Sequence, residues 1–216
     1  PLELSPVREP VDLLAGGTLD AFDAVAFDGT STLDDIARLE EDGVLHVAGD
    51  PRGYLVSKRW YRDYELEPQW RWPAGERPGN SGVLVHVTTP RLFYGWPRAL
   101  EVQLQHGSAG DFWTIGRDVD VTLEADASRR TAEVPWDLHS HRRLPRLVDG
   151  IEKPAGQWNA MRVVCRGGDV VVYVNGVEVQ RGLDGTLTEG GIALQSEGAA
   201  IEFREVRVKP LRRVAP

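Results

Sequence analysis

The chain has 216 residues, of which 41% are hydrophobic and 27% are charged, a composition ordinary for one globular domain with a sizeable core. Its net charge of −8 argues against nucleic acid or an anionic membrane as a partner, because both require a basic surface. No run approaches the roughly 18 apolar residues of a membrane span. The N-terminal residues lack a signal-peptide pattern, so both a cytoplasmic and a secreted or periplasmic location stay open.

Short stretches of alternating or apolar residues, separated by Gly, Pro and Asn, follow one another along almost the whole chain. We predict strands over 43–48, 54–58, 60–72, 81–88, 98–105, 111–115, 119–124, 158–165, 170–174, 177–181, 191–195 and 201–209. Many short strands joined by turns indicate an all-β sandwich or barrel. Asn175-Gly176 predicts a type I′ hairpin, and Gly167-Gly168-Asp169 predicts a second hairpin just before it.

Helix is scarce. Residues 33–39 could form a turn or two, because Thr32 and Asp35 have the spacing of a capping box. Residues 126–155 are the least regular part of the sequence, and we predict that they form a long arm lying over one sheet. No linker or internal repeat interrupts the chain, so residues 1–216 are expected to form a single domain.

The stretch from residue 61 to residue 103 is the most informative, because its side chains alternate between apolar and polar with the period of a strand. Its first strand has two contrasting faces: Tyr64, Leu66, Trp70 and Trp72 against Glu65, Glu67, Gln69 and Arg71. In the next two strands the polar positions are His86, Glu101, Gln103 and Gln105. Since consecutive strands usually pair, we expect one sheet face to carry these four residues together: Arg71, His86, Glu101 and Gln103.

Such a face has two interpretations. An antiparallel sheet often has one face in water, and that face is polar without any function. This one, however, combines acids, amides, Arg and His with the nearby aromatic residues Trp96, Phe112 and Trp113. Sugars need that mixture, since planar polar groups bind hydroxyls and aromatic rings cover the C–H faces. Glu101 and His86 could also transfer protons near neutral pH.

The segment Gly79-Asn80-Ser81-Gly82 also has two interpretations. It could simply lead into the next strand. It could instead be a loop that brings backbone amides to a ligand, because Gly and Asn permit a tight backbone path.

Other kinds of site have less support. The single cysteine, Cys165, falls on the apolar face of a predicted strand, which indicates a buried residue rather than a reactive thiol. His139 and His141 could face one metal ion, but the sequence predicts no third ligand. Glu65 and Glu67 lie about 7 Å apart on one strand face, which allows a glycosidase-like carboxylate pair and nothing more. Serine-hydrolase and nucleotide-binding motifs are absent.

A series of short motifs runs along nearly the whole chain: Asp42-Gly43-Val44-Leu45, Gly53-Tyr54-Leu55, Tyr61-Arg62-Asp63-Tyr64-Glu65-Leu66, Gly79-Asn80-Ser81-Gly82-Val83, Leu100-Glu101-Val102-Gln103, Gly110-Asp111-Phe112-Trp113, Glu152-Lys153-Pro154-Ala155-Gly156-Gln157-Trp158-Asn159, Val174-Asn175-Gly176, Ile192-Ala193-Leu194-Gln195 and Ile201-Glu202-Phe203-Arg204. In this order and spacing they resemble the 3-keto-disaccharide hydrolase family.

The resemblance implies a concanavalin A-like jelly roll of two antiparallel sheets, with carbohydrate bound on a concave sheet face. It also implies cleavage of glycosides already oxidised at C3, by removal of the C2 proton, loss of the C1 substituent and addition of water. That chemistry needs a base and a stabiliser for the enolate oxygen. The sequence requires no cofactor and leaves a divalent metal open.

The motifs carry candidate site residues with them. Glu101 and Gln103 match the family's Glu-Val-Gln strand, and Asn80 matches its Gly-Asn-Ser-Gly turn. We predict Glu101 or His86 as the catalytic base. The predicted substrate-binding residues, with Trp113 stacking on the sugar, are Arg71, Asn80, Gln103, Asp111, Trp113 and Lys153. This chain has Ser196-Glu197-Gly198 where many relatives carry Asp-His-Gly.

The sequence therefore allows three candidate functions. The first is an enzyme that cleaves 3-keto-glycosides, the second a lectin-like domain that binds carbohydrate without cleaving it, and the third an extracellular adhesion module.

Overall fold

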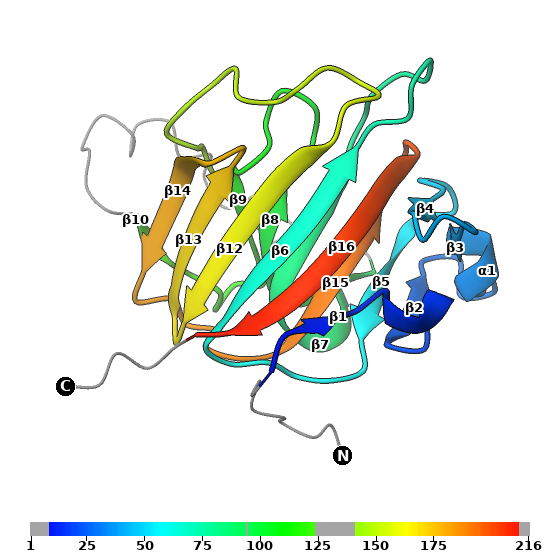
Figure 1. Cartoon of the computed structure of the whole chain (residues 1–216). Coiled ribbons are helices and arrows are strands. Elements are labelled where there is room, and N and C mark those ends of the chain that lie inside the picture. Colours follow the sequence, from blue (N-terminus) through cyan, green and yellow to red (C-terminus); the bar gives the residue numbers. More distant parts are fainter. Residues whose placement is uncertain (1–8, 94, 124–140, 212–216) are drawn as a thin grey trace.

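The computed structural model describes residues 9–93, 95–123 and 141–211, which form two antiparallel sheets packed face to face (Figure 1). The larger sheet of this part of the chain has nine strands, in the order β10 (Thr122–Leu123), β14 (Val177–Leu183), β13 (Asp169–Val174), β12 (Asn159–Arg166), β6 (Tyr64–Arg71), β16 (Ile201–Pro210), β4 (Leu45–Val47) and β3 (Ala37–Leu39), with β1 (Val11–Asp12) beside β16. In Figure 1 this sheet lies in front, with its outer face towards the reader.

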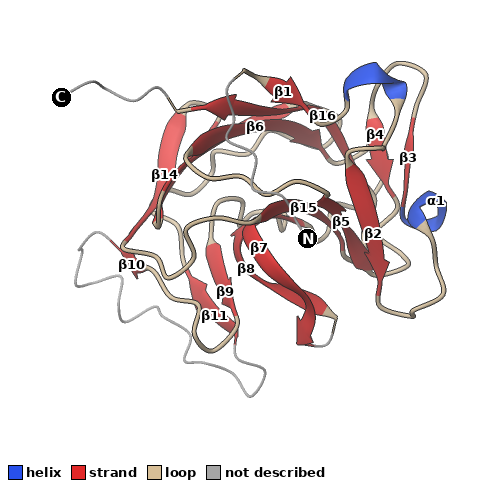
Figure 2. Ribbon diagram, turned by 90° about the horizontal axis from the view of Figure 1, so that it is seen from below, coloured by secondary structure: helices blue, strands red, loops and turns tan. Residues whose placement is uncertain are grey.

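The smaller sheet has seven strands within the described residues, in the order β11 (His141–Leu144), β9 (Phe112–Ile115), β8 (Trp96–Gln103), β7 (Gly82–Phe93), β15 (Gly191–Ser196), β5 (Gly53–Ser57) and β2 (Phe22–Ala26). Figure 2 shows the nine-stranded sheet arching over it. The two sheets confirm the predicted all-β jelly-roll sandwich.

The core lies between the two sheets because each strand turns alternate side chains inward. In β6 this alternation is regular, and its inward side chains include Leu66 and Trp70, both fully buried. Leu100 and Val102 of β8 meet them from the other sheet as members of the same core cluster. Cys165 belongs to this cluster, and burial raises the pKa of its thiol to about 12, as expected for a structural cysteine.

Local sequence signals hold where they predict turns. Asn175 and Gly176 have φ angles of 50° and 84°, which fits the type I′ turn predicted between β13 and β14. The capping box at Thr32 and Asp35 is present. The helix α1 (Leu33–Ile36) is shorter than predicted, because the chain becomes extended at Ala37 and enters β3. A 3₁₀ turn, Ala15–Gly17, follows β1.

The strand prediction missed β1, β2, β3 and β11. It also described residues 126–155 as an arm over one sheet, whereas His141–Leu144 pair with β9 and form the edge strand β11. Residues 126–140 of that predicted arm lie outside the described residues. Within the described residues, none of the helices has the length and apolar character needed to cross a membrane.

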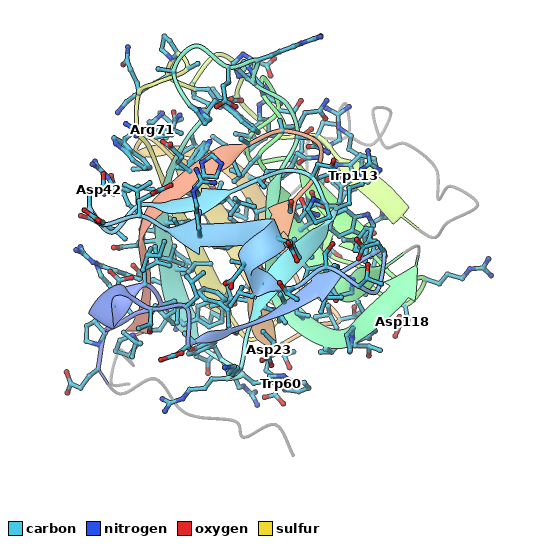
Figure 3. All side chains as sticks on the ribbon, turned by 90° about the vertical axis from the view of Figure 1, so that its right-hand side faces the viewer. Asp23, Asp42, Trp60, Arg71, Trp113 and Asp118 are labelled. Carbon is cyan, nitrogen blue, oxygen red and sulfur yellow. The ribbon has the colours of Figure 1, made fainter. Side chains whose placement is uncertain are left out.

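One predicted pairing is wrong, and it changes the site. We expected β6, β7 and β8 to be neighbours, but β6 lies between β12 and β16 in the nine-stranded sheet, while β7 and β8 pair in the seven-stranded sheet. The polar face of β6 and the polar face of β8 are therefore the outer faces of two different sheets. Figure 3 shows the consequence, with Arg71 of β6 far from Trp113 of β9.

Candidate functional site

The candidate site begins on β8, in the middle of the seven-stranded sheet. Leu100 and Val102 point into the core, so Glu101 and Gln103 point to the outer face. Both polar side chains are nonetheless buried, with 6% and 4% of their surface exposed. A buried carboxyl group on the outer face of a sheet indicates a cover of neighbouring side chains, and those neighbours form the site.

The neighbouring strands supply that cover. Trp113 of β9 lies directly opposite Glu101 in the sheet register, so the two side chains share the outer face. Gln195 of β15 forms a side-chain hydrogen bond with Glu101. Gly82 of β7 makes room for this contact, because a Cβ atom there would lie 2.3 Å from Gln195 Oε1 and 2.7 Å from Glu101 Oε1.

The segment 79–82, which leads into β7, packs against the end of β15 and the residues that follow it. Ser81 is fully buried, and its hydroxyl donates to the carbonyl oxygen of Gln195 over 2.9 Å. Gly79 packs so closely on Ala199 that a Cβ at position 79 would lie 2.4 Å from that methyl group. Asn80 forms a β-bridge with Glu197. The segment therefore brings Glu197 beside Glu101, and none of its residues has a positive φ.

These side chains enclose a pocket of about 200 Å³. Its lining residues are Asn80, Trp96, Glu101, Gln103, Gln105, Trp113, Ile115, Gln195 and Glu197. Three buried polar atoms of the lining have no hydrogen-bond partner in the structure: Asn80 Oδ1, Trp113 Nε1 and Gln195 Oε1. Buried polar atoms are nearly always paired, so these three indicate a place for a polar ligand or water.

An aromatic wall closes one side of the pocket. Trp96 lines the pocket and stacks on Tyr54 with ring centroids 6.3 Å apart, and Phe27 meets Trp96 edge-on at 4.6 Å. Trp113 adds a second indole to the lining. The pocket thus combines amides, carboxyl groups and flat aromatic surfaces in one small space.

The two carboxyl groups of the pocket have different acidities. Burial raises the pKa of Glu197 to about 7, an effect that the nearby charge of Arg52 partly offsets. Burial also raises the pKa of Glu101 well above its usual range, and the charge of Glu197 raises it further. Glu197 therefore titrates near neutral pH, whereas burial and the neighbouring carboxylate both disfavour ionisation of Glu101.

His86 does not lie in the pocket, contrary to its predicted place on the polar face. The pairing of β7 with β8 shifts register after Val85, and His86 itself has a φ of 56°. This irregularity turns the imidazole into the core, where it meets the Tyr64 ring edge-on at 6.0 Å. Burial lowers the pKa of His86 to about 4.

Arg71 lies on the outer face of the other sheet. Its guanidinium pairs with Glu202 and stacks on the indole of Trp158, 4.4 Å from the ring centroid. Glu65 and Glu67, on the same outer face, are each paired with a cation, Arg162 and Lys209 respectively. Because β6 and β8 belong to different sheets, this face lies apart from Glu101.

Asp111 and Lys153 also occupy structural positions. Asp111 is fully buried, and its carboxylate accepts hydrogen bonds from the guanidinium groups of Arg143, over 2.7 Å, and Arg146, over 3.1 Å. The ammonium group of Lys153 donates to the carbonyl oxygen of Trp158 over 2.9 Å. Neither residue lines the pocket.

Of the predicted site residues, the structure thus brings together Glu101, Gln103, Asn80 and Trp113. It adds Gln195 and Glu197, which the sequence did not propose as site residues. The one available signal for Glu197 was the departure of Ser196-Glu197-Gly198 from the Asp-His-Gly pattern of many relatives.

The described residues were also compared with the ligand sets that hold metal ions in proteins. Among the described residues, no three side chains of His, Cys, Asp or Glu are grouped so that they could hold one. His139 of the predicted histidine pair lies outside the described residues.

Comparison with known proteins supports the resemblance found in the motifs. The sequence model of the family described as the 3-keto-alpha-glucoside-1,2-lyase-like domain matches residues 9–209. A search of curated proteins found no match.

Solved structures share the fold at low sequence identity. A proposed glycosyl hydrolase from Parabacteroides distasonis is 21% identical, with a TM-score of 0.62, over 94% of this chain and 100% of that one. A carbohydrate binding module from Bacillus subtilis is 11% identical, with a TM-score of 0.57, over 87% of this chain and 96% of that one. A Bacillus subtilis protein of unknown function with a galectin-like fold is 13% identical, with a TM-score of 0.54, over 96% and 97%.

Proposed function

Because the chain belongs to the family of 3-keto-alpha-glucoside-1,2-lyase-like domains, we propose that it cleaves glycosides whose sugar ring carries a ketone at C3. The observation that carries this proposal is the pair Glu101 and Glu197, two carboxyl groups of unequal pKa in one sugar-sized pocket with indole walls. Two titratable groups whose environments separate their pKa values are typical of an acid and a base that act together.

In the proposed reaction the C3 ketone acidifies the adjacent C2–H bond. The carboxylate of Glu197 removes that proton, and the electron pair of the C–H bond passes into an enolate whose negative charge lies on the C3 oxygen. A pKa of about 7 suits a base that works near neutral pH. This assignment replaces His86, which lies in the core.

The enolate then expels the substituent at C1. The C1–O bond breaks, a C1–C2 double bond forms, and the protonated Glu101 supplies a proton to the departing oxygen. Water adds to C1 and a proton returns to C2, so that the net result is hydrolysis. If water does not add, the products are the unsaturated keto sugar and the free alcohol.

The unpaired polar atoms of the pocket suit this chemistry. The indole N–H of Trp113 lines the pocket and is proposed to donate a hydrogen bond to the enolate oxygen. The unpaired Asn80 Oδ1 and Gln195 Oε1 are acceptors, and they are proposed to bind hydroxyl groups of the sugar. Gln103 would hold a hydroxyl group. Its side-chain oxygen accepts from the backbone N–H groups of Leu104 and Gln105, which fixes the orientation of the amide.

The proposal is tested by incubating the protein with 3-keto-maltose in D₂O, with and without added divalent ions and with a chelator. Nuclear magnetic resonance should show release of glucose and entry of deuterium at C2 of the oxidised ring. Absence of turnover in every condition, with 3-keto-trehalose and 3-keto-cellobiose also inert, would overturn the proposal. Calorimetric binding of the unoxidised disaccharides without any product would then favour the lectin-like function.

A further inference from the structure

A second and larger cavity adjoins the pocket that holds Glu101. Its volume is about 890 Å³, and it shares three lining residues with the pocket: Asn80, Gln105 and Glu197. The two spaces therefore lie side by side along the wall that carries Glu197, and we call the two together the hollow. We call the larger space the outer cleft.

The two parts of the hollow differ in capacity. The pocket, at about 200 Å³, is smaller than the roughly 300–1,000 Å³ of pockets that bind drug-sized ligands, so it suits a single sugar ring. The outer cleft falls inside that range. A ligand with one ring in the pocket would thus have space for a longer group beyond Glu197.

The chemistry of the two linings also differs. Trp96 and Trp113 line the pocket, but among the residues that the structure describes no Phe, Tyr or Trp lines the outer cleft. Its lining instead includes Asp50, Glu76 and Arg77. Such a surface offers hydrogen bonds to a hydroxyl-rich ligand and, within the described residues, no aromatic ring on which an aryl group could stack.

Arg77 has a further property that suits ligand binding. Its side chain is exposed, and it forms no ion pair with any other residue that the structure describes. A guanidinium group carries five N–H donors in a fixed plane, which can bind two neighbouring hydroxyl oxygens at once. Its donors are therefore free to bind a ligand in the outer cleft.

On the basis of the proposed function, we propose that the outer cleft binds the leaving group and that this group is a saccharide chain of two or more units. The substrate would then be an oligosaccharide whose non-reducing terminal ring carries the C3 ketone. That ring fills the pocket with its C1–C2 bond beside Glu101 and Glu197, and the remaining units lie along the outer cleft against Arg77.

The experiment compares kcat/KM for 3-keto-maltose, 3-keto-maltotriose and 3-keto-maltotetraose, each oxidised on the non-reducing ring, and for the 3-keto p-nitrophenyl glucoside. We expect kcat/KM to rise at least about tenfold from the disaccharide to the longer substrates, since remote contacts contribute to transition-state binding. The aryl glucoside should gain no such advantage. Arg77→Ala should remove most of the gain, whereas Arg59→Ala, an exposed arginine outside both spaces, should keep it.

A second variant tests the space itself. Ala200→Trp should fill part of the outer cleft and abolish the chain-length preference while turnover of the disaccharide continues. The inference is wrong if every leaving group is cleaved with the same kcat/KM and neither variant alters the ratios. In that outcome the proposed function still stands.

If no oxidised sugar is cleaved, binding measurements still test whether the outer cleft prefers longer saccharides. Calorimetry with unoxidised maltose, maltotriose and maltotetraose should then show affinity rising with chain length in the wild type and a flat series in Arg77→Ala. Equal affinities across the wild-type series, or no binding, would overturn the inference independently of catalysis.

Discussion

Glu101 of β8 and Glu197, which directly follows β15, line the same pocket, and the charge of Glu197 raises the pKa of Glu101. The charges of the two groups interact, so the two carboxyl groups titrate as a pair. This relationship supports the proposed roles of Glu197 as base and Glu101 as acid.

The pair predicts a bell-shaped pH dependence of kcat/KM. Activity should rise as the pH increases through about 7, where Glu197 becomes ionised, and fall at higher pH, where Glu101 loses its proton. Initial rates on 3-keto-maltose from pH 5 to pH 10 would measure both limbs. A profile whose acid limb lies near the ordinary carboxyl pKa of about 4.5 would contradict the assignment.

Replacement of either carboxyl group should slow chemistry more than binding. Glu101→Gln and Glu197→Gln should each lower kcat by about 10²- to 10⁴-fold with a small change in KM, since general acid–base groups contribute in that range. Glu67→Gln, on the outer face of the other sheet, is the matched control and should leave kcat unchanged.

Gly82→Ala should impair the site with little effect on the fold. The new methyl group would collide with the side-chain oxygens of Gln195 and Glu101, and a shift of about 1 Å in a catalytic group can cost roughly 10²-fold in rate. Gly191→Ala is a suitable control. Its Cβ would lie 3.2 Å from a methyl group of Val56, a less severe contact than the 2.3 Å at position 82. Equal kcat/KM in the two variants would argue against a role for the Glu101–Gln195 contact.

Asp111→Ala should act on stability and not on the proposed substrate. Removing the carboxylate would leave the guanidinium of Arg146, only 9% exposed, with the exposed Asp149 as its carboxylate partner, so the loss should stay below the roughly 3–5 kcal/mol typical of a buried charge left unpaired. Denaturant unfolding would measure the loss. For the fraction that stays folded, KM for 3-keto-maltose should be unchanged, and a large rise in KM would return Asp111 to the substrate-binding residues.

His86→Asn separates a core histidine from a catalytic one. Asn tolerates the φ of 56° and removes the imidazole, so kcat should stay within about threefold of the wild type. The folded-state pKa of His86 is lowered from 6.5 to about 4, so its contribution to stability is complete above pH 6.5 and is lost as the pH falls through 4. The wild type should therefore lose stability over this interval more steeply than the variant. If the substitution slowed turnover by roughly two orders of magnitude or more, the range typical of a lost general base, the catalytic assignment would be restored.

The sequence by itself determined the local features of this protein. Alternation with period two identified the inward residues of β6, such as Leu66 and Trp70, because that period is a property of an extended chain wherever it packs. Asn175-Gly176 determined its hairpin for a similar reason, since the turn depends on the conformations that these two residues allow. The family motifs located Glu101, Gln103, Asn80 and Trp113, which do meet in one pocket.

Only the tertiary structure decided which of the polar faces belong together. Whether β6 pairs with β7 or with β12 and β16 depends on contacts between segments far apart in the chain, and alternation carries no information about them. The irregularity at His86 reverses a side chain that perfect alternation would have placed outside. The two arginines that bind Asp111 come from a region predicted only as an irregular arm, and Glu197 reaches Glu101 through its bridge to Asn80.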